Sequence, residues 1–414
     1  MATPRPGLFG GLHNGHGLAK ERDKQPYRID RSVATHFFDG KRCWCHARAG
    51  IVPGAGQSDL PRVVMTMNSL DVSGSDVFRF MAELHSDDFG KTWSDPQEVD
   101  ALALRREDID GEELPVGVCD FWPTWHRTTQ KLLGTGHTVV YTKDWKVKRP
   151  RPRHTSYSVY EPQNQRWSRW RKLQLPDQPM YQDAGAGCSQ RFDLDDGTIL
   201  LPFYFRPPHL NSRVTVSQCE FDGTDLSFVK HGNVMQIDNE TRGLHEPSLT
   251  RFNDVFYLTL RNDEQGYVTR GDNGIDFEPI RSWRFDDGEL LGNYNTQQHW
   301  VTHSDALYLV YTRRGADNDH VFRHRAPLFM AQVDPERMCV LRDTEQVLVE
   351  ERGARLGNFG VTHVSPHETW VTVAEWMQTK GPKRVLDVDN PYGSDGSVWV
   401  ARIQWDQPNQ LFTA

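Results

Sequence analysis

Six short segments rich in polar or aromatic residues recur along the chain, and each is followed by an apolar run of strand length. They open at His46, Asp120, Asp183, His245, Asn295 and Gly357. The openings lie roughly 50–75 residues apart, a spacing that indicates one four-stranded sheet per unit. A ring of such sheets is a β-propeller. The pattern therefore predicts an all-β fold made of a single propeller.

The strand pattern yields six blades. A seventh could lie at the N-terminus or between Leu102 and Leu114, where the pattern is weakest. We expect residues 1–25 to be an N-terminal extension and residues 26–414 to form one propeller domain that carries the active site. Residues 26–40 should pair with the last blade, because only three clear strands follow Gly357.

One turn carries a structural motif. Its sequence SDDFGKTW holds Ser86, Asp88, Gly90, Thr92 and Trp93, which match the Asp-box pattern Ser-x-Asp-x-Gly-x-Thr-Trp. Short polar side chains of this kind bond the backbone of a hairpin turn. We expect the turn to lie on the face opposite the inner-strand openings, so Asp88 is predicted to be structural, and a weaker copy spans residues 270–277.

The six cysteines show no metal-ligand spacing and are expected to be buried free thiols. No apolar run approaches the roughly 18 residues of a membrane span, so no membrane partner is expected. The N-terminal residues show no secretory signal. This predicts a cytoplasmic protein, or a secreted or periplasmic one if a signal was removed.

Charge is unevenly distributed. The net charge of −8 argues against nucleic-acid binding. Yet the loops expected between second and third strands, on the face of the inner-strand openings, are basic. They hold Lys143, Lys146, Lys148, Arg149, Arg151 and Arg153; Arg206, His209 and Arg213; Arg313, Arg314, Arg323 and Arg325; and Lys380, Lys383 and Arg384. This distribution favours an anionic ligand, although charged solvated loops would give the same pattern.

Aromatic residues on the same face favour a sugar, since their rings stack on pyranoses while arginine binds carboxylates through two hydrogen bonds. Trp122 and Tyr204 are the main candidates. The expected partner is therefore an acidic oligosaccharide or polysaccharide.

Two resemblances follow from longer motifs. The Asp box and HEPSLTRFNDVFYLTLRN resemble the sialidase superfamily, which implies functional roles for Glu246 and Arg261. The segment HARAGIVPG is similar to that superfamily's first-blade Arg-Ile-Pro motif and implies Arg48 as a carboxylate ligand. The superfamily's first-blade acid and nucleophilic Tyr/Glu pair have no counterpart.

The chain as a whole resembles the L-rhamnose-α-1,4-D-glucuronate lyases, formerly described as rhamnosidases, which act on arabinogalactan side chains. The resemblance runs through CWCHARAGIVPG, LLGTGHTVVY, LHEPSLTR and NYNTQQHW. It implies seven blades, release of rhamnose from rhamnosyl-glucuronate caps by β-elimination, and His46 as a single catalytic histidine.

Elimination from a uronate needs a neutralised carboxylate and a base for the C5 proton. Candidates to neutralise the carboxylate are Arg261, Arg313, Asn295, Gln297 and Gln298, or a divalent cation such as Ca²⁺, for which the sequence indicates no ligand set. Candidates for the base are His137, His245, His299 and Tyr204. Hydrolysis would instead use two carboxyls, from Asp120, Asp183 and Glu246. A rhamnosidase or sialidase-like glycosidase and a non-catalytic glycan-binding propeller stay open.

Overall fold

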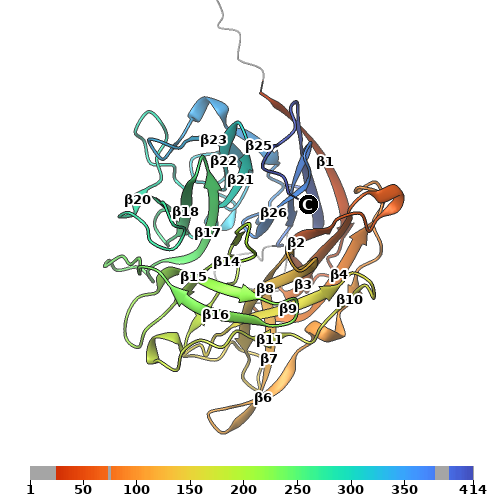
Figure 1. Cartoon of the computed structure of the whole chain (residues 1–414), viewed down its shortest axis with the longest axis vertical. Helices are drawn as coiled ribbons and strands as arrows, with labels where there is room; N and C mark the ends of the chain where they lie inside the picture. The colour runs from red at the N-terminus through yellow and green to blue at the C-terminus, as the bar shows by residue number, and fades with distance from the viewer. Residues whose placement is uncertain (1–24, 73–75, 378–390, 414) are drawn as a thin grey trace, which may run out of the picture.

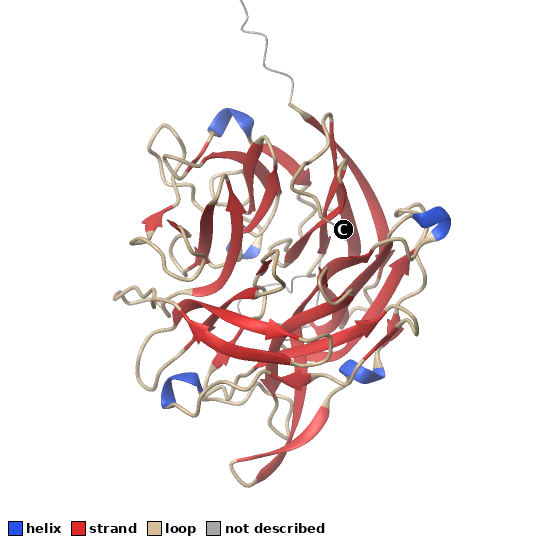
Figure 2. Cartoon of the chain, in the orientation of Figure 1, coloured by secondary structure: helices blue, strands red, loops and turns tan. Residues whose placement is uncertain are grey.

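The computed structural model describes residues 25–72, 76–377 and 391–413. This part of the chain forms six β-sheets arranged in a ring, joined by loops and a few three-residue 3₁₀ turns (Figures 1 and 2). The protein is thus an all-β, six-bladed propeller, as the spacing of the openings predicts. The expectation of seven blades, which the lyase resemblance implied, is wrong for the described residues.

Each blade is an antiparallel meander that runs from the axis outwards. Blade one contains β2 (Arg42–Val52), β3 (Arg62–Asp71), β4 (Phe78–Ser86) and β5 (Gln97–Glu98). Blade two contains β7 (Glu112–His126), β8 (Lys131–Val140), β9 (Thr155–Glu161) and β10 (Arg166–Trp167), with β11 (Arg171–Lys172) beside β9. Blade three contains β12 (Ala184–Gly185), β13 (Phe192–Asp193), β14 (Ile199–Phe205), β15 (Arg213–Phe221) and β16 (Leu226–His231).

The remaining blades follow the same plan. Blade four contains β17 (His245–Phe252), β18 (Val255–Arg261), β19 (Tyr267–Gly271) and β20 (Arg281–Ser282). Blade five contains β21 (His299–His303), β22 (Ala306–Tyr311), β23 (Leu328–Asp334), β24 (Cys339–Val340) and β25 (Gln346–Val349). Blade six contains β26 (Phe359–Ser365), β27 (Glu368–Ala374), β28 (Ser397–Trp405) and β1 (Tyr27–His36).

The second strand of a blade is buried on both faces, because neighbouring blades pack against it. In β22 the sequence ALYLVY is apolar throughout and every residue is buried. A strand covered on both sides loses the alternation of a half-exposed strand and reads as a continuous apolar run. This is why the blades are visible in the sequence.

The ring is closed by the N-terminal strand. β1 pairs antiparallel with β28, from Tyr27 opposite Trp405 to His36 opposite Ser397. The Tyr27 ring lies 5.4 Å from the Trp405 ring and 5.6 Å from that of Tyr308 in blade five. The predicted pairing of residues 26–40 with the last blade is confirmed.

The region between Leu102 and Leu114 does not form a seventh blade. It holds β6 (Arg105–Ile109), which pairs with the first half of β7. The two strands form a hairpin that projects from blade two (Figure 1). The weak strand pattern there reflects an exposed extension of an existing sheet.

The Asp box is a turn motif, as predicted. The Asp88 carboxylate accepts hydrogen bonds from the Thr92 backbone N–H and hydroxyl, which lower its pKa to about 2. Trp93 packs near Trp370 of blade six, with ring centroids 6.2 Å apart. The motif therefore ties blade one to blade six.

All six cysteines are buried and free, which confirms the prediction from their spacing. They are Cys43, Cys45, Cys119, Cys188, Cys219 and Cys339. Within the described residues, no helix is long and apolar enough to cross a membrane.

We expect Tyr27→Ala to lower the free energy of unfolding by about 3–5 kcal/mol, because it removes a buried aromatic ring at the ring closure. Tyr27 is 5% exposed. The control is Val33→Ala on the same strand, where Val33 is 42% exposed and the loss should stay below about 1 kcal/mol. Urea unfolding measures both, and equal losses would show that β1 does not hold the ring closed.

Candidate functional site

Five blades place a non-glycine residue in the left-handed backbone region at the mouth of the inner strand. These residues are His46, Asp120, Cys188, Glu246 and Asn295, with φ of 59°, 53°, 59°, 43° and 53°. The strand ladders shift register at the corresponding points of β2, β7 and β17. Backbone of this kind is uncommon outside glycine and concentrates at functional sites.

These residues surround one end of the axis. A cavity of about 1540 Å³ opens there and is lined by residues of all six blades. Its wall carries eleven lysines and arginines but seven aspartates and glutamates. An acidic protein thus surrounds its cavity with an excess of cations.

A buried carboxylate, that of Asp120, lies at the floor of the cavity. One oxygen lies 2.9 Å from His46 Nε2, and the other lies 3.2 Å from His137 Nε2. The Cys188 thiol donates to it at 2.6 Å, and Arg48 Nη1 lies 3.7 Å away. Burial alone would raise the pKa of Asp120, but His46 and then Arg48 hold it well below its usual range. Asp120 is therefore ionised.

His46 is an imidazolium ion. Asn68 donates its amide N–H to the Val118 carbonyl, which turns Asn68 Oδ1 towards His46 Nδ1 at 3.4 Å. Both ring nitrogens thus face acceptors and both donate. Burial opposes the charge, but the Asp120 carboxylate outweighs it and the pKa of His46 is raised to about 10.

His137 is neutral, although it binds the same carboxylate. Burial, and then the charge of Arg153, lower its pKa to about 3. Its Nε2–H points at Asp120, and its Nδ1 lies 3.4 Å from the Cys119 thiol. Both ring nitrogens are therefore engaged within the protein.

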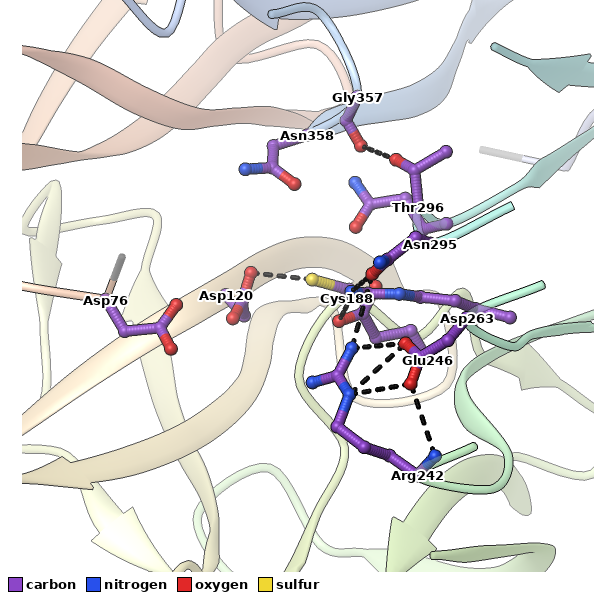
Figure 3. Close-up of polar contacts among 12 residues, drawn as sticks. Asp76, Asp120, Cys188, Arg242, Glu246, Asp263, Asn295, Thr296, Gly357 and Asn358 are labelled. Carbon is purple, nitrogen blue, oxygen red and sulfur yellow. Dashed lines mark hydrogen bonds and ion pairs between the residues drawn. The ribbon is translucent and has the colours of Figure 1, made fainter. Parts of the chain in front are cut away.

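Acid–arginine pairs line the cavity wall. Arg153 Nε donates to Asp183 at 2.8 Å, and Asp76 binds Arg151. On blade four, Arg261 binds Glu246. Arg242, just before β17, binds Asp263 at 2.5 Å (Figure 3).

The Asn295 side chain links two of these arginines. Its Oδ1 accepts from Arg261 at 2.8 Å and from Arg242 at 3.2 Å. The Asn295 carbonyl accepts from Arg325 at 2.5 Å. Three guanidinium groups thus converge on one residue.

Arg325 is a buried cation with no carboxylate partner among the described residues. It is 3% exposed and its Nε makes no hydrogen bond there. Burial, and then the nearby charges of Arg261 and Arg323, lower its pKa well below the ordinary value. A buried charge of this kind calls for an anion in the cavity.

His245 and Tyr204 form a neutral pair on the wall, with ring centroids 5.3 Å apart. Burial, and then Arg261, lower the pKa of His245 well below its ordinary value, so the ring is unprotonated. Burial raises the pKa of Tyr204 well above 10, so the phenol keeps its proton. Neither side chain has a hydrogen-bond partner within the described part of the chain.

Only some of the residues singled out from the sequence line the cavity. Those that line the cavity are His46, His137, His245, Tyr204, Glu246 and Arg261. Arg48, Trp122 and His299 lie beneath it: Arg48 stacks on Trp122, and His299 packs on Trp122 and Phe359.

Three further candidates do not line it. Gln297 and Gln298 are buried, and their amides donate to the carbonyls of Phe359 and Thr296. Arg313 pairs with Glu345, with its Nη2 at 2.6 Å. We therefore leave these residues out of the proposed site.

The basic loops reach the cavity in part, since Lys143, Arg213, Arg313 and Arg314 do not line it. Residues 145–154 between β8 and β9 line the cavity, as do Arg206 and His209 after β14 and Arg323 and Arg325 before β23. Of these loops, that with Lys380, Lys383 and Arg384 lies outside the described residues.

Arg325 was placed only as one of many loop cations, and Asp76 was not singled out. Both side chains are ordinary surface types in sequence. Arg325 stands out because it is buried, and Asp76 because it binds Arg151 at the cavity; charge patterning reveals neither property. Cys188 stands five residues after Asp183, and the sequence marks it only as an inner-strand thiol.

The donor set does not fit a calcium ion. One cluster in the described chain brings three metal-ligating side chains within 4.8 Å, namely Cys119, Asp120 and His137. Its oxygens belong to Asp120 alone and already bind His46 and His137. Calcium takes six to eight oxygens. We derive no step through a metal.

Comparison with known proteins leaves the family open. No protein-family model matches the sequence. No curated protein matches it either.

Solved structures match in fold. A protein of unknown function from Dyadobacter fermentans aligns with a TM-score of 0.63 and 12% identity, over 91% of this chain and 99% of that one. Trypanosoma rangeli sialidase aligns with a TM-score of 0.57 and 12% identity, over 90% of this chain and 59% of its own. The NanB sialidase of Streptococcus pneumoniae aligns with a TM-score of 0.56 and 10% identity, over 91% and 70%.

These likenesses define the fold class: the chain is a sialidase-like β-propeller with six blades. The Asp box, the ring closure and the cationic axial cavity all belong to this one architecture.

The charge on His46 predicts a pH effect on stability. Its folded pKa of about 10 exceeds the unfolded value of about 6.5, so its contribution is complete below pH 6.5 and is lost as pH rises through 10. We expect the free energy of unfolding of the wild type to fall over this window relative to that of His46→Gln. Urea unfolding at several pH values measures this, and parallel curves for the two proteins would contradict the assignment.

Proposed function

We propose that the protein is a carbohydrate-active enzyme that cleaves an acidic glycan in the axial cavity by β-elimination at a uronate. The observation that carries the proposal is the neutral pair His245 and Tyr204 beside Arg261 and Arg325. It combines an unprotonated base, a protonated acid and a cationic site for a carboxylate in one wall.

Carboxylate binding is assigned to Arg325 and to the arginines joined by Asn295. A uronate carboxylate placed there would neutralise the charge of Arg325, which pairs with no acid in the described part of the chain. Neutralising that carboxylate also lowers the cost of removing the adjacent C5 proton. Arginine suits this role because its planar fork matches a carboxylate.

His245 is assigned as the base. The nearby arginines depress its pKa in the free protein, so its ring is ready to accept a proton. When the substrate carboxylate offsets those charges, the basicity of His245 rises. His245 then takes the C5 proton, the C4–C5 double bond forms, and the C4–O bond breaks as Tyr204 gives its proton to the leaving oxygen.

The other histidines fit positioning roles better. His46 is protonated and His137 has both nitrogens engaged. His299 is fully buried and bonds Ser248 at 2.6 Å. We assign His46, with Asp120, to holding the cavity floor.

Hydrolysis is the second candidate, supported by the fold likeness to sialidases, one of them solved with sialic acid. It needs a protonated carboxyl as general acid. The carboxylates Asp76, Asp120, Asp183 and Glu246 are each bound to an arginine or a histidine, and the pKa values of Asp76 and Asp120 are lowered. This arrangement favours elimination. From the sequence resemblance, the specific reaction that we propose is the release of L-rhamnose from a rhamnosyl-glucuronate cap.

The first test follows the product from rhamnosyl-glucuronate oligosaccharides. Elimination yields free rhamnose and an unsaturated uronate that absorbs in the ultraviolet, whereas hydrolysis yields a saturated uronate. We expect His245→Ala and Tyr204→Phe each to lower kcat about 10²–10⁴-fold through loss of a proton-transfer group. The control is His367→Ala at an exposed turn. A saturated product would overturn the lyase and favour hydrolysis.

The second test concerns the carboxylate. We expect Arg325→Gln to lower kcat/KM about tenfold to more than a hundredfold by removing a charge-assisted hydrogen bond. Arg313→Gln is the comparison, because Arg313 pairs with Glu345 away from the cavity and should have a much smaller effect. A larger loss of kcat/KM for Arg313→Gln than for Arg325→Gln would contradict the assignment. It would show that the substrate carboxylate binds at Arg313 instead.

A further inference from the structure

Four arginines line the cavity without a carboxylate partner among the described residues. They form two groups. One group consists of Arg149 and Arg206, from the loop between β8 and β9 and the loop after β14. The other consists of Arg323 and Arg325, just before β23. The proposed function uses only the second group.

The two groups come from different blades. In a closed ring of six blades, blade two stands opposite blade five across the axis. Arg149 belongs to blade two, Arg206 to its neighbour blade three, and Arg323 and Arg325 to blade five.

The cavity has room for more than one sugar. Its volume of about 1540 Å³ exceeds the 300–1,000 Å³ of typical pockets for small ligands. Arg206 donates one hydrogen bond, to the Leu210 carbonyl, and Arg149 donates none within the described residues. Burial, and then Arg151, lower the pKa of Arg149. Both side chains are exposed and line the cavity, where an anionic ligand can reach them.

We propose that Arg149 and Arg206 form a second anion subsite on the loops of blades two and three, which binds another acidic group of the same glycan as the reacting uronate. This inference rests on the proposed function. It narrows the substrate to oligosaccharides that carry at least two anionic groups. The second group is a carboxylate or a sulfate ester, since arginine binds both through paired hydrogen bonds.

The test compares three substrates that share the reacting uronate. In them the neighbouring residue carries a carboxylate, a sulfate ester or a neutral hydroxymethyl group. We expect the wild type to favour one of the charged substrates about tenfold or more in kcat/KM, mainly through KM. The preferred substrate then identifies the acidic group. In Arg149→Gln/Arg206→Gln this preference should disappear.

The control is Arg166→Gln, which changes an exposed arginine of β10 outside the cavity and should keep the preference. Equal kcat/KM for the three substrates in the wild type, or an unchanged preference in the double variant, would overturn the second subsite. If no substrate is cleaved, the proposed function fails, and calorimetry with the same compounds still tests the subsite. Equal affinity for the neutral and charged compounds would then overturn it.

Discussion

The architecture of the site depends on one buried carboxylate, that of Asp120. It binds His46 of β2, His137 of β8 and Cys188 of the blade-three opening, so three blades meet on one charge. Two histidines in different protonation states bind this carboxylate: His46 is charged, whereas His137 is neutral. Removing one partner of such a buried pair typically costs about 3–5 kcal/mol. The floor of the cavity is therefore rigid and electrostatically defined.

Above this floor, most cations of the cavity wall pair with acids, and a few do not pair with one among the described residues. Arg153 and Arg261 pair with Asp183 and Glu246, which holds their guanidinium groups in place. Arg325 has no such acid among the described residues although it is buried. Proteins depart from full charge compensation mainly at functional sites. The unpaired arginines thus mark where, on the proposed function, an anionic ligand would bind.

The sequence predicted the blades well because second strands such as β22, which are buried on both faces, are apolar along their whole length. It predicted the openings less accurately. In blades three and four the residues at the strained positions are Cys188 and Glu246, whereas the pattern marked Asp183 and His245. A one-residue bulge leaves no trace in hydrophobic periodicity, because it shifts the register without changing composition. Nor does hydrophobic periodicity show that His46, His137 and His245 differ in protonation state, because that difference depends on partners from other blades.

Composition and periodicity alone determined that the chain is a propeller closed by its N-terminal strand, and that cations gather at one end of its axis. Both properties are local, because a strand buried on two faces must be apolar and the charge of a loop follows from its own residues. Only the tertiary structure decided which cations are neutralised and which histidine is free. Those properties depend on side chains that lie dozens to hundreds of residues apart, as when Arg48 donates to the Phe359 carbonyl, and folding alone brings them together.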